Sequence, residues 1–586
     1  MKKVFLRVTP SDKFYQNYKN LNLCYWAKDF KKKHYDVKTE NFFNAQNNKN
    51  RIKRNRLSHT ISLKIIKFLY NKLSNNFYKK LSKEEYEIIL YPFIQSFTYM
   101  ILDRKFMIDE FLLRNEIKKI AVNDILEKEN KFLCNSSIDF LKVIQTEGFN
   151  NFLILDIFKR NKNLKIEIKK KRFKDNEIII KKEKFTIISK LKNYLQISLS
   201  KFSYKFNKIV FESIYYPKFE FIKICLSFGI FPYKVFKLFQ LNFSSNLDLN
   251  KRNSLKSSIR RSNFSKLEKM ISDIIVNNIP KNYLENFNQI IKHLNQYPKK
   301  KKIITSISFY YNEIFRIFLV LARRNKTKII QCDHGGGFSF QNIPNHLYIQ
   351  KKIFDNFAVW GKHSHGKNIS SKKKIFINPT LSSLNSNLNI DIKNHLSILF
   401  YESRKFTIEY DALQSFENQN KALNNLIYVS KKLPREIRDT TVFRTLRNYG
   451  LEGEKRFNRE VLNSKKYGKN IELSKSFAKI LKHSKLIICN FPSTSFSEAL
   501  SFNIPTLLFC DENEILLDER SKSFFIKMKK NKMIFSNRIK LIEHIKKIWK
   551  DPNEWWMKGN IQNLRTNYLR NYFNVIDDLK CSWIKK

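Results

Sequence analysis

Three consecutive glycines follow a histidine in the stretch CDHGGGFSF, residues 332–340. The chain has 586 residues and only 11 glycines, so this run is unusual for its composition. The preceding run TKIIQ predicts a strand, which places His334 at a carboxyl strand end, where open α/β sheets bind ligands. His334 is a candidate general base, because imidazole ionises near neutral pH. The amides of Gly335, Gly336 and Gly337 could cradle a phosphate or a developing negative charge. A tight turn with a structural histidine is the alternative.

A second polar group lies in ICNFPSTSFSEALSF, residues 488–502. The pattern predicts a strand, then a helix that starts around Ser493, Thr494 and Ser495. Hydroxyls and free amides at a helix N-terminus bind anions, because the helix dipole favours negative charge there. Glu498, one turn further, either completes a capping box with Ser495 or points into a cleft and accepts sugar or ribose hydroxyls. An ordinary capped helix is the alternative.

Four arginines crowd the stretch LPREIRDTTVFRTLRNYG, residues 433–450. They are Arg435, Arg438, Arg444 and Arg447. Guanidinium groups suit phosphates and carboxylates, because their donors form a planar fork. We expect one or two of the four to face a ligand and the others to lie on the surface.

Metal chemistry has little support in the sequence. His363 and His365 are two residues apart, as metal ligands can be, but no acidic residue is near them in the sequence, so we interpret them as loop residues. No Asp-x-Asp pair follows a predicted strand, which argues against an essential divalent cation. We therefore expect no metal site and no cofactor other than a nucleotide-activated substrate.

The elements that position these residues alternate between strand and helix from about residue 300. Strands are predicted in KKIITSISF, KTKIIQCD, FDNFAVWG and KKIFINP, with a helix in YYNEIFRIFLVLARRN. The alternation restarts at HLSILFYES, continues with a helix over 411–425 and a strand in NNLIYVSKKLP, and ends with a strand in PTLLFCD. Two such sets, split near residue 385, predict an α/β fold with two Rossmann-like domains facing a cleft. We expect His334 and the Ser493–Ser495 helix start to face each other across it.

The rest of the chain completes the predicted organisation. The segment 161–184 is Lys-rich and is expected to be an exposed hairpin or linker. In DPNEWW, Asp551 or Asn553 should cap a helix that buries Trp555 and Trp556. The predicted parts are a mainly helical N-terminal region (1–160), a basic, insert-rich segment (161–270), a first Rossmann-like, acceptor-side domain (271–385), a second Rossmann-like, donor-side domain (390–545) and C-terminal helices packing back (546–586).

The composition limits the compartment and the partners. Lys and Arg number 112 against 52 Asp and Glu, a formal charge of +60 that suits anionic partners, although A- and T-rich codons would give the same bias. Seven scattered cysteines without a CxxC pair fit a reducing compartment. The first residues do not form a signal peptide pattern, so we expect a cytoplasmic protein. The apolar stretch 219–243 is either a membrane-surface element, peripheral to the inner face of the plasma membrane, or part of a core with outward lysines.

Several stretches resemble a family of transferases encoded in bacterial surface-carbohydrate biosynthesis clusters, which are similar to glycosyltransferases with two Rossmann-like domains (GT-B). The matching stretches are IIQCDHGGGFSF, FDNFAVWG, REIRDTTVFRTLRNYG, HSKLIICNFPSTSFSEALSFNIPTLLF and IKKIWKDPNEWWMKGNIQNLR. The resemblance is strong from 300 to 575. It implies that Ser493, Thr494, Ser495 and Glu498 belong to a donor site.

Two functions follow from these observations. The first is a transferase that moves a sugar or sugar-like group from a nucleotide-activated donor onto a cell-surface glycan or its lipid-linked precursor. In it, His334 deprotonates the acceptor hydroxyl or stabilises charge, while the helix start and an arginine hold the leaving phosphate in place of a metal. The alternative is a non-catalytic basic protein that binds nucleic acid or anionic membrane through its lysine tracts. No recognisable nucleic-acid-binding module is present, which favours the enzyme.

Overall fold

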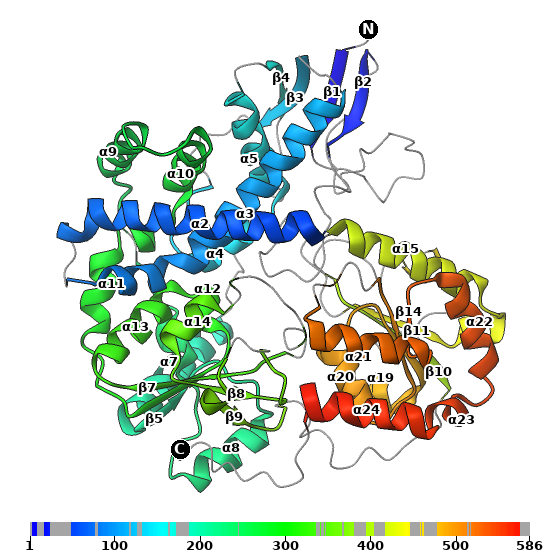
Figure 1. The fold of residues 1–586 in the computed structure, drawn as a ribbon. Coiled ribbons are helices and arrows are strands. Elements are labelled where there is room, and N and C mark those ends of the chain that lie inside the picture. Colours follow the sequence, from blue (N-terminus) through cyan, green and yellow to red (C-terminus); the bar gives the residue numbers. More distant parts are fainter. Residues whose placement is uncertain are drawn as a thin grey trace.

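The computed structural model contains three β-sheets with helices around them (Figure 1). In each sheet, every pair of neighbouring strands is parallel. We refer to the three sheets with their helices as the N-terminal unit, the first α/β unit and the second α/β unit. The structure describes residues 3–8, 17–23, 48–76, 80–115, 119–125, 132–161, 164–171, 187–243, 245–335, 340, 345, 347–365, 369–379, 394–402, 416–445, 457–458, 460–461, 477–511, 515 and 517–574.

The N-terminal unit has a four-stranded sheet that the sequence analysis missed. Its strand order is β2-β1-β3-β4. The predicted hairpin or linker over 161–184 is wrong for residues 165–171, because this stretch pairs with β3 residue by residue. It forms an edge strand, where lysines are common because they discourage pairing with another chain. The strands are β1 (Lys3–Arg7), β2 (Tyr18–Asn22), β3 (Lys119–Ile125) and β4 (Lys165–Lys171).

The helix α5 packs on this sheet, and the long helices α2 and α3 lie beyond it, which confirms the helical part of the N-terminal prediction. The two longest, α2 and α3, pack against each other, and α3 also contacts helices of the first α/β unit. Apolar side chains at helical spacing along α3, such as Ile94, Phe97 and Ile101, are fully buried or nearly so. The helices are α2 (Asn48–Leu73), η2 (Ser74–Asn76), α3 (Lys83–Asn115), α4 (Ser137–Val143) and α5 (Glu147–Lys159).

The segment 161–270, predicted to be insert-rich, is largely ordered secondary structure. Within 219–243, Phe221, Ile224, Val235 and Leu238 are buried, so most of this apolar stretch belongs to a core, whereas Phe219 and Leu226 are exposed. The helices here are α7 (Ile187–Phe206), α8 (Lys218–Ser227), η4 (Val235–Phe239), α9 (Leu249–Arg260) and α10 (Lys266–Asn278).

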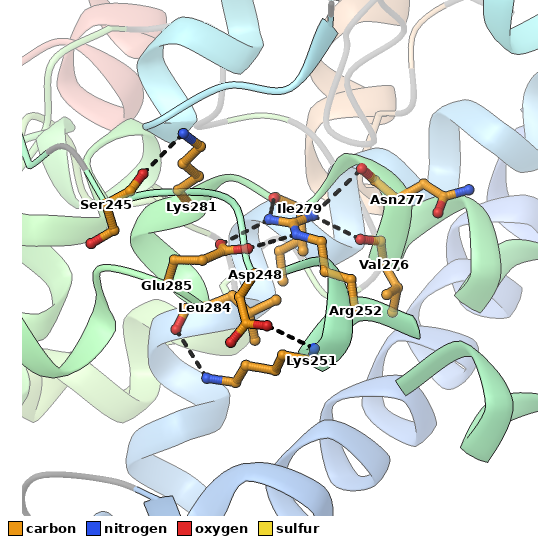
Figure 2. A network of polar contacts seen from close by, with 10 residues as sticks. All are labelled: Ser245, Asp248, Lys251, Arg252, Val276, Asn277, Ile279, Lys281, Leu284 and Glu285. Carbon is orange, nitrogen blue, oxygen red and sulfur yellow. Dashed lines mark hydrogen bonds and ion pairs between the residues drawn. The ribbon is translucent and has the colours of Figure 1, made fainter. Parts of the chain in front are cut away.

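A buried arginine joins α9 to the end of α10 (Figure 2). The Nε and Nη2 atoms of Arg252 lie 2.7 and 2.9 Å from the carboxylate oxygens of Glu285. The same guanidinium donates to the backbone carbonyls of Val276 and Ile279, each at 2.9 Å. These carbonyls lack helical partners at the end of α10, so the arginine satisfies them. Some of the positive charge is therefore structural.

The first α/β unit has its strands in chain order, β5-β6-β7-β8-β9. Four of the five were predicted, and β5 was not, so the sheet begins before the expected limit at residue 271. The strands are β5 (Ile209–Phe211), β6 (Lys302–Thr305), β7 (Lys328–Cys332), β8 (Asn356–Val359) and β9 (Lys374–Phe376). The remaining helices are η5 (Lys281–Tyr283), α11 (Phe287–Leu294), α12 (Ser308–Tyr311), α13 (Glu313–Arg324), α14 (Tyr348–Ile353) and η8 (Ser371–Lys373).

The second α/β unit has the strand order β11-β10-β12-β13-β14. The winding direction therefore reverses between β10 and β12, and such a switch point is where doubly wound sheets bind ligands, at the carboxyl strand ends. Two separate sheets in this half of the chain confirm the predicted α/β fold with two Rossmann-like domains. The strands are β10 (His395–Phe400), β11 (Thr441–Thr445), β12 (Ser484–Cys489), β13 (Thr506–Phe509) and β14 (Ile534–Phe535).

One predicted strand of this unit is wrong. The stretch NNLIYVSKKLP continues a helix, α15, and the strand lies further on, in TVFRT. The buried side chains of Leu423, Leu426 and Ile427 follow the helical period, which the short apolar run had concealed. The helices are α15 (Phe416–Lys432), α16 (Arg435–Asp439), α19 (Phe477–His483), α20 (Thr494–Ser501), α21 (Glu519–Lys530), α22 (Arg538–Ile548), α23 (Pro552–Trp556) and α24 (Gly559–Tyr572).

The tryptophan-bearing helix α23 has the predicted cap and burial. The side chain of Asp551 accepts a hydrogen bond from the amide of Asn553 at 2.9 Å, with Pro552 at the first helical position. Trp555 is 8% exposed and Trp556 is fully buried, and the indole of Trp556 donates to Asn503. Both indoles are therefore packing residues.

The end of the chain joins the two α/β units. Helix α24 packs on α20 and α21 of the second unit. The carbonyl of Asn571 then accepts from the amide of His363 at 2.8 Å, and the amide of Asn574 donates to the carbonyl of Trp360 at 2.7 Å. A Cβ at Gly361 would lie 2.3 Å from the Asn571 carbonyl oxygen, so this approach requires glycine.

Candidate functional site

His334 lies just beyond the carboxyl end of β7, the central strand of the sheet in the first α/β unit. Its side chain is half-buried, and its ring centroid is 6.2 Å from that of Tyr215, an exposed residue that follows β5. The predicted position at a carboxyl strand end is therefore confirmed. Gly335 is described as well, whereas Gly336 and Gly337 lie outside the described residues.

A buried carboxylate holds the base of this loop. Asp333 accepts the backbone amide of Trp360 at 3.1 Å, and its other oxygen lies 2.8 Å from Nε2 of His365. Burial alone would raise the pKa of Asp333, but the charge and hydrogen bond of His365, the Trp360 amide and the charge of His334 together lower it. Asp333 is therefore a carboxylate that ties the ends of β7 and β8 together beside His334.

His365 lies in a turn after β8, as interpreted from the sequence, but the expectation that it has no acidic partner is wrong. Its partner Asp333 is 32 residues away in the chain and follows a different strand, so sequence spacing could not reveal the pair. His363, in contrast, has no acidic hydrogen-bond partner in the described structure; burial and then the charge of Arg520 lower its pKa. Among the described residues, no group of three His, Cys, Asp or Glu is placed to hold a metal ion.

The second polar group starts helix α20 directly after β12, next to the switch point. The side-chain amide of Asn490 exchanges two hydrogen bonds with the backbone of Tyr401, at 2.6 and 3.2 Å, and so joins the ends of β12 and β10. Ser493 is the N-cap residue, but its hydroxyl bonds to that of Ser495 at 2.8 Å and not to a backbone amide. The capping box suggested for Glu498 is therefore not formed.

The two polar edges meet. A Cβ added at Gly335 would lie 3.3 Å from Oγ1 of Thr494, tighter than ordinary van der Waals contact. Nearby, the carbonyl of Phe340 accepts from the amide of Asp518 at 3.1 Å, and the Phe340 ring lies 6.4 Å from that of Phe491. The His334 loop of the first unit and the α20 start of the second therefore face each other, as predicted from the carboxyl-end rule.

Glu498 lies one turn into α20 and is 6% exposed. Burial raises its pKa to about 8, although the charge of Arg444 acts in the opposite direction. No described residue hydrogen bonds to its carboxyl group. Because the group is mostly protonated at neutral pH, it can donate a hydrogen bond to an anionic oxygen as well as accept one.

The predicted arginines separate into two groups. Arg444 lies near the carboxyl end of β11, on the same edge as α20, and its charge reaches Glu498. Arg435 and Arg438 belong to α16, which precedes β11 and so lies at the opposite, amino edge of the sheet. Arg435 is exposed and pairs with Asp439 at 3.4 Å. The structure therefore brings only Arg444 to the site, while Arg447 lies outside the described residues.

The sequence analysis also missed a buried carboxyl at this edge of the first sheet. Glu212 follows β5 and is fully buried, and it accepts the hydroxyl proton of Thr305 at 2.8 Å. Burial raises the pKa of Glu212, while hydrogen bonds from Ser213 and Ser308 act in the opposite direction. The hydroxyl of Ser213 accepts from the amide of Ser308 at 3.2 Å, which fixes the chain after β6. A lone glutamate after three apolar residues carries no sequence signal.

A family model of the LIC12162 family transferases matches residues 4–586. The chain belongs to this family. The match spans all three units, and the family is one of transferases, so this protein is a transferase. No curated protein matches the chain.

Solved structures were also compared with this LIC12162 family transferase. S. aureus MnaA with UDP is 12% identical, with a TM-score of 0.32, over 79% of this chain and 98% of the other. UDP-GlcNAc 2-epimerase from Neisseria meningitidis bound to UDP-GlcNAc is 12% identical, with a TM-score of 0.29, over 77% and 98%. Sucrose-phosphate synthase from Thermosynechococcus elongatus is 14% identical, with a TM-score of 0.27, over 50% and 76%. Likeness at this level does not identify an activity for this chain.

Proposed function

We propose that this transferase moves a sugar or sugar-like group from a nucleotide-activated donor onto a cell-surface glycan or its lipid-linked precursor. The observation that carries the proposal is the approach of Gly335 to Thr494, which sets a histidine of one sheet edge against the helix start of another. A transfer reaction needs a base for the acceptor and an anion site for the leaving group, and these two edges supply one each.

His334 removes the proton from the acceptor hydroxyl as that oxygen attacks the transferred group. Its place beside a fixed carboxylate, Asp333, supports this role, because the negative charge stabilises the imidazolium that forms. The amide of Gly335 directly follows His334 and can meet the developing charge.

The second unit receives the leaving phosphate. Ser493, Thr494 and Ser495 provide hydroxyls and amides at the start of α20, where the helix dipole favours negative charge. Arg444 adds a full positive charge, and protonated Glu498 donates a hydrogen bond to the phosphate or to a ribose hydroxyl. This arrangement needs no divalent cation, so EDTA should leave the rate unchanged. Arg435 and Arg438 take no part, given their place at the other edge.

The partners follow from this mechanism: a nucleotide-sugar donor and a glycan or lipid-linked acceptor in the cytoplasm, at the inner face of the membrane. The alternative, a non-catalytic protein that binds nucleic acid or anionic membrane, does not use the site. Within the described residues, no helix has the length and apolarity of a membrane span.

A thermal-shift screen tests the donor. Uridine, cytidine and guanosine diphosphates and their sugars are added to the full chain, and one nucleotide is expected to raise the Tm saturably, because a ligand that binds only the folded state stabilises it. The shift should persist as salt rises from 0.05 to about 0.3 M, unlike binding by counterion release. If no nucleotide raises the Tm and only polyanions bind, with a steep salt dependence, the proposal is wrong.

A further inference from the structure

Helix α7 carries a row of large apolar side chains that stay exposed in the described structure, although the ring of Phe202 also contacts that of Phe231. No described residue between Ile187 and Leu199 is buried. Large exposed apolar surface is uncommon on soluble proteins and indicates an interaction site. We call the exposed residues the α7 stripe: Ile187, Ile188, Leu191, Tyr194, Leu195, Phe202 and Phe206, with exposed fractions from 46% to 85%.

The C-terminal end of α7 is firmly held, so the stripe has a fixed place on the first α/β unit. The hydroxyls of Ser200 and Ser203 donate to the carbonyls of Lys234 and Tyr233, at 3.2 and 2.7 Å. The hydroxyl of Tyr204 donates to the carbonyl of Pro298 at 2.7 Å, just before β6. These contacts use one face of the helix and leave the opposite face outward.

The stripe follows one face of the helix. At about 100° per residue, its seven positions fall within about 120° of one another around the helix axis. Two of the seven are phenylalanines and one is a tyrosine. Phenylalanine and leucine are typical of the apolar face of helices that lie in a membrane surface, and tyrosine is enriched at the headgroup level.

The charge of α7 selects the kind of surface that it fits. The helix sequence IISKLKNYLQISLSKFSYKF contains four lysines and no acidic residue. Lys192, Lys201 and Lys205 are exposed beside the stripe. A second copy of the chain would bring these like charges together, whereas an anionic surface would pair with them. Lysine stems can also lie along an apolar surface while the ammonium groups reach headgroups.

We propose that α7 lies in the surface of an anionic lipid bilayer, with the stripe among the acyl chain ends and the lysines on headgroup phosphates. The inference goes beyond the proposed function, because it identifies the surface through which the transferase reaches a membrane. It concerns lipid binding and not nucleotide binding. The proposed membrane contact can therefore be refuted while the proposed donor site holds, and the donor site can be refuted while the membrane contact holds.

The test is sedimentation of the full chain with vesicles at about 0.15 M salt. Phosphatidylcholine vesicles with and without 30% phosphatidylglycerol, roughly the anionic level at which basic helices bind, are the probe. The test variant is Leu191→Glu with Leu195→Glu. The control is Leu113→Glu with Ile526→Glu, which places the same two charges at other exposed apolar positions, 80% and 50% exposed.

Wild type and control are expected to bind the anionic vesicles, and the α7 variant to bind at least tenfold more weakly. Equal losses in the two variants would mean that net charge alone drives binding, and would overturn the proposal. Binding by the α7 variant at the wild-type level would overturn the proposal too. So would the absence of vesicle binding together with light scattering that shows wild type as a dimer and the α7 variant as a monomer. Unchanged circular dichroism confirms that both variants fold.

Discussion

The two facing edges of this transferase are built in different ways. At the first edge, the titratable groups are fixed by partners: Asp333 accepts from Trp360 and pairs with His365, while Glu212 accepts from Thr305. At the second edge, the hydroxyls of Ser493 and Ser495 bond to each other, and no described residue hydrogen bonds to the carboxyl of Glu498.

This difference separates two tasks. A base must be held in one geometry, so its surroundings carry hydrogen bonds that are already made. A phosphate site must exchange its internal contacts for contacts with the ligand, so hydroxyls that bond only to each other and a carboxyl to which no described residue hydrogen bonds suit it. The first edge should therefore control the rate, and the second should control donor affinity.

The largest expected effect tests the first edge. Replacing His334 with alanine should lower turnover by about 10²-fold or more, as the loss of general base catalysis does, and leave the Kd of the donor nearly unchanged. Turnover and donor binding are measured separately, by product formation and calorimetry. His483→Ala, a histidine beside the amino end of β12, is the matched control. A similar loss of donor affinity in His334→Ala would remove the distinction between the edges.

The next effect concerns Glu498 and pH. Its pKa is raised to about 8 in the folded state, so between roughly pH 5 and 8 the folded protein keeps a proton that the unfolded chain releases. Stability from this group therefore falls as pH rises through that window. Glu498→Gln does not titrate, and should be more stable than wild type at pH 9 by on the order of 2 kcal/mol, with little difference at pH 5. Denaturant unfolding at both pH values measures this; a pH-independent difference would contradict it.

A smaller effect is expected at the start of α20. Ser493→Ala with Thr494→Ala should weaken donor binding about tenfold, which corresponds to about 1.4 kcal/mol, while turnover at saturating donor stays close to wild type. Ser501→Ala, at the other end of the same helix, is the control, because its hydroxyl bonds only within the helix. If turnover falls and affinity holds, the tasks of the two edges are assigned the wrong way round.

The smallest effect tests the contact between the edges itself. Gly335→Ala adds a methyl carbon 3.3 Å from Oγ1 of Thr494, which is a tight contact. Thr494→Ala removes that oxygen atom. The two changes should couple by about 0.5–1 kcal/mol in a double-mutant cycle of unfolding free energy, with the second relieving the first. Additive effects would mean that the edges do not touch in solution.

The sequence predicted the parts of the fold that follow from local pattern. The alternation after residue 300 located β6 to β9 and most of the second unit, and the carboxyl-end rule placed the loop after β7, at Gly335, against Thr494. It failed at β5, which has few residues, and at β11, which follows an apolar helix of similar composition. It also failed at the N-terminal sheet, because most residues of its edge strand β4 are lysines and do not give an apolar strand pattern.

Within the site, the failures have one physical cause. The Asp333–His365 pair and the cluster around Glu212 join residues from different strand ends, so their spacing in the chain carries no information. The separation of Arg444 from Arg435 and Arg438 depends on where β11 lies, and that strand had been predicted in the wrong place.

The crossing of α24 back to Trp360 and His363 has a mechanical consequence. The chain passes from the first α/β unit to the second between β9 and β10, and returns after α24. The return crossing is held by two backbone hydrogen bonds and by the close approach at Gly361, so it acts as a pivot between the two units. Motion that opens the space between His334 and α20 for a donor is then a turn about this pivot, and not a sliding of Asn571 past Gly361.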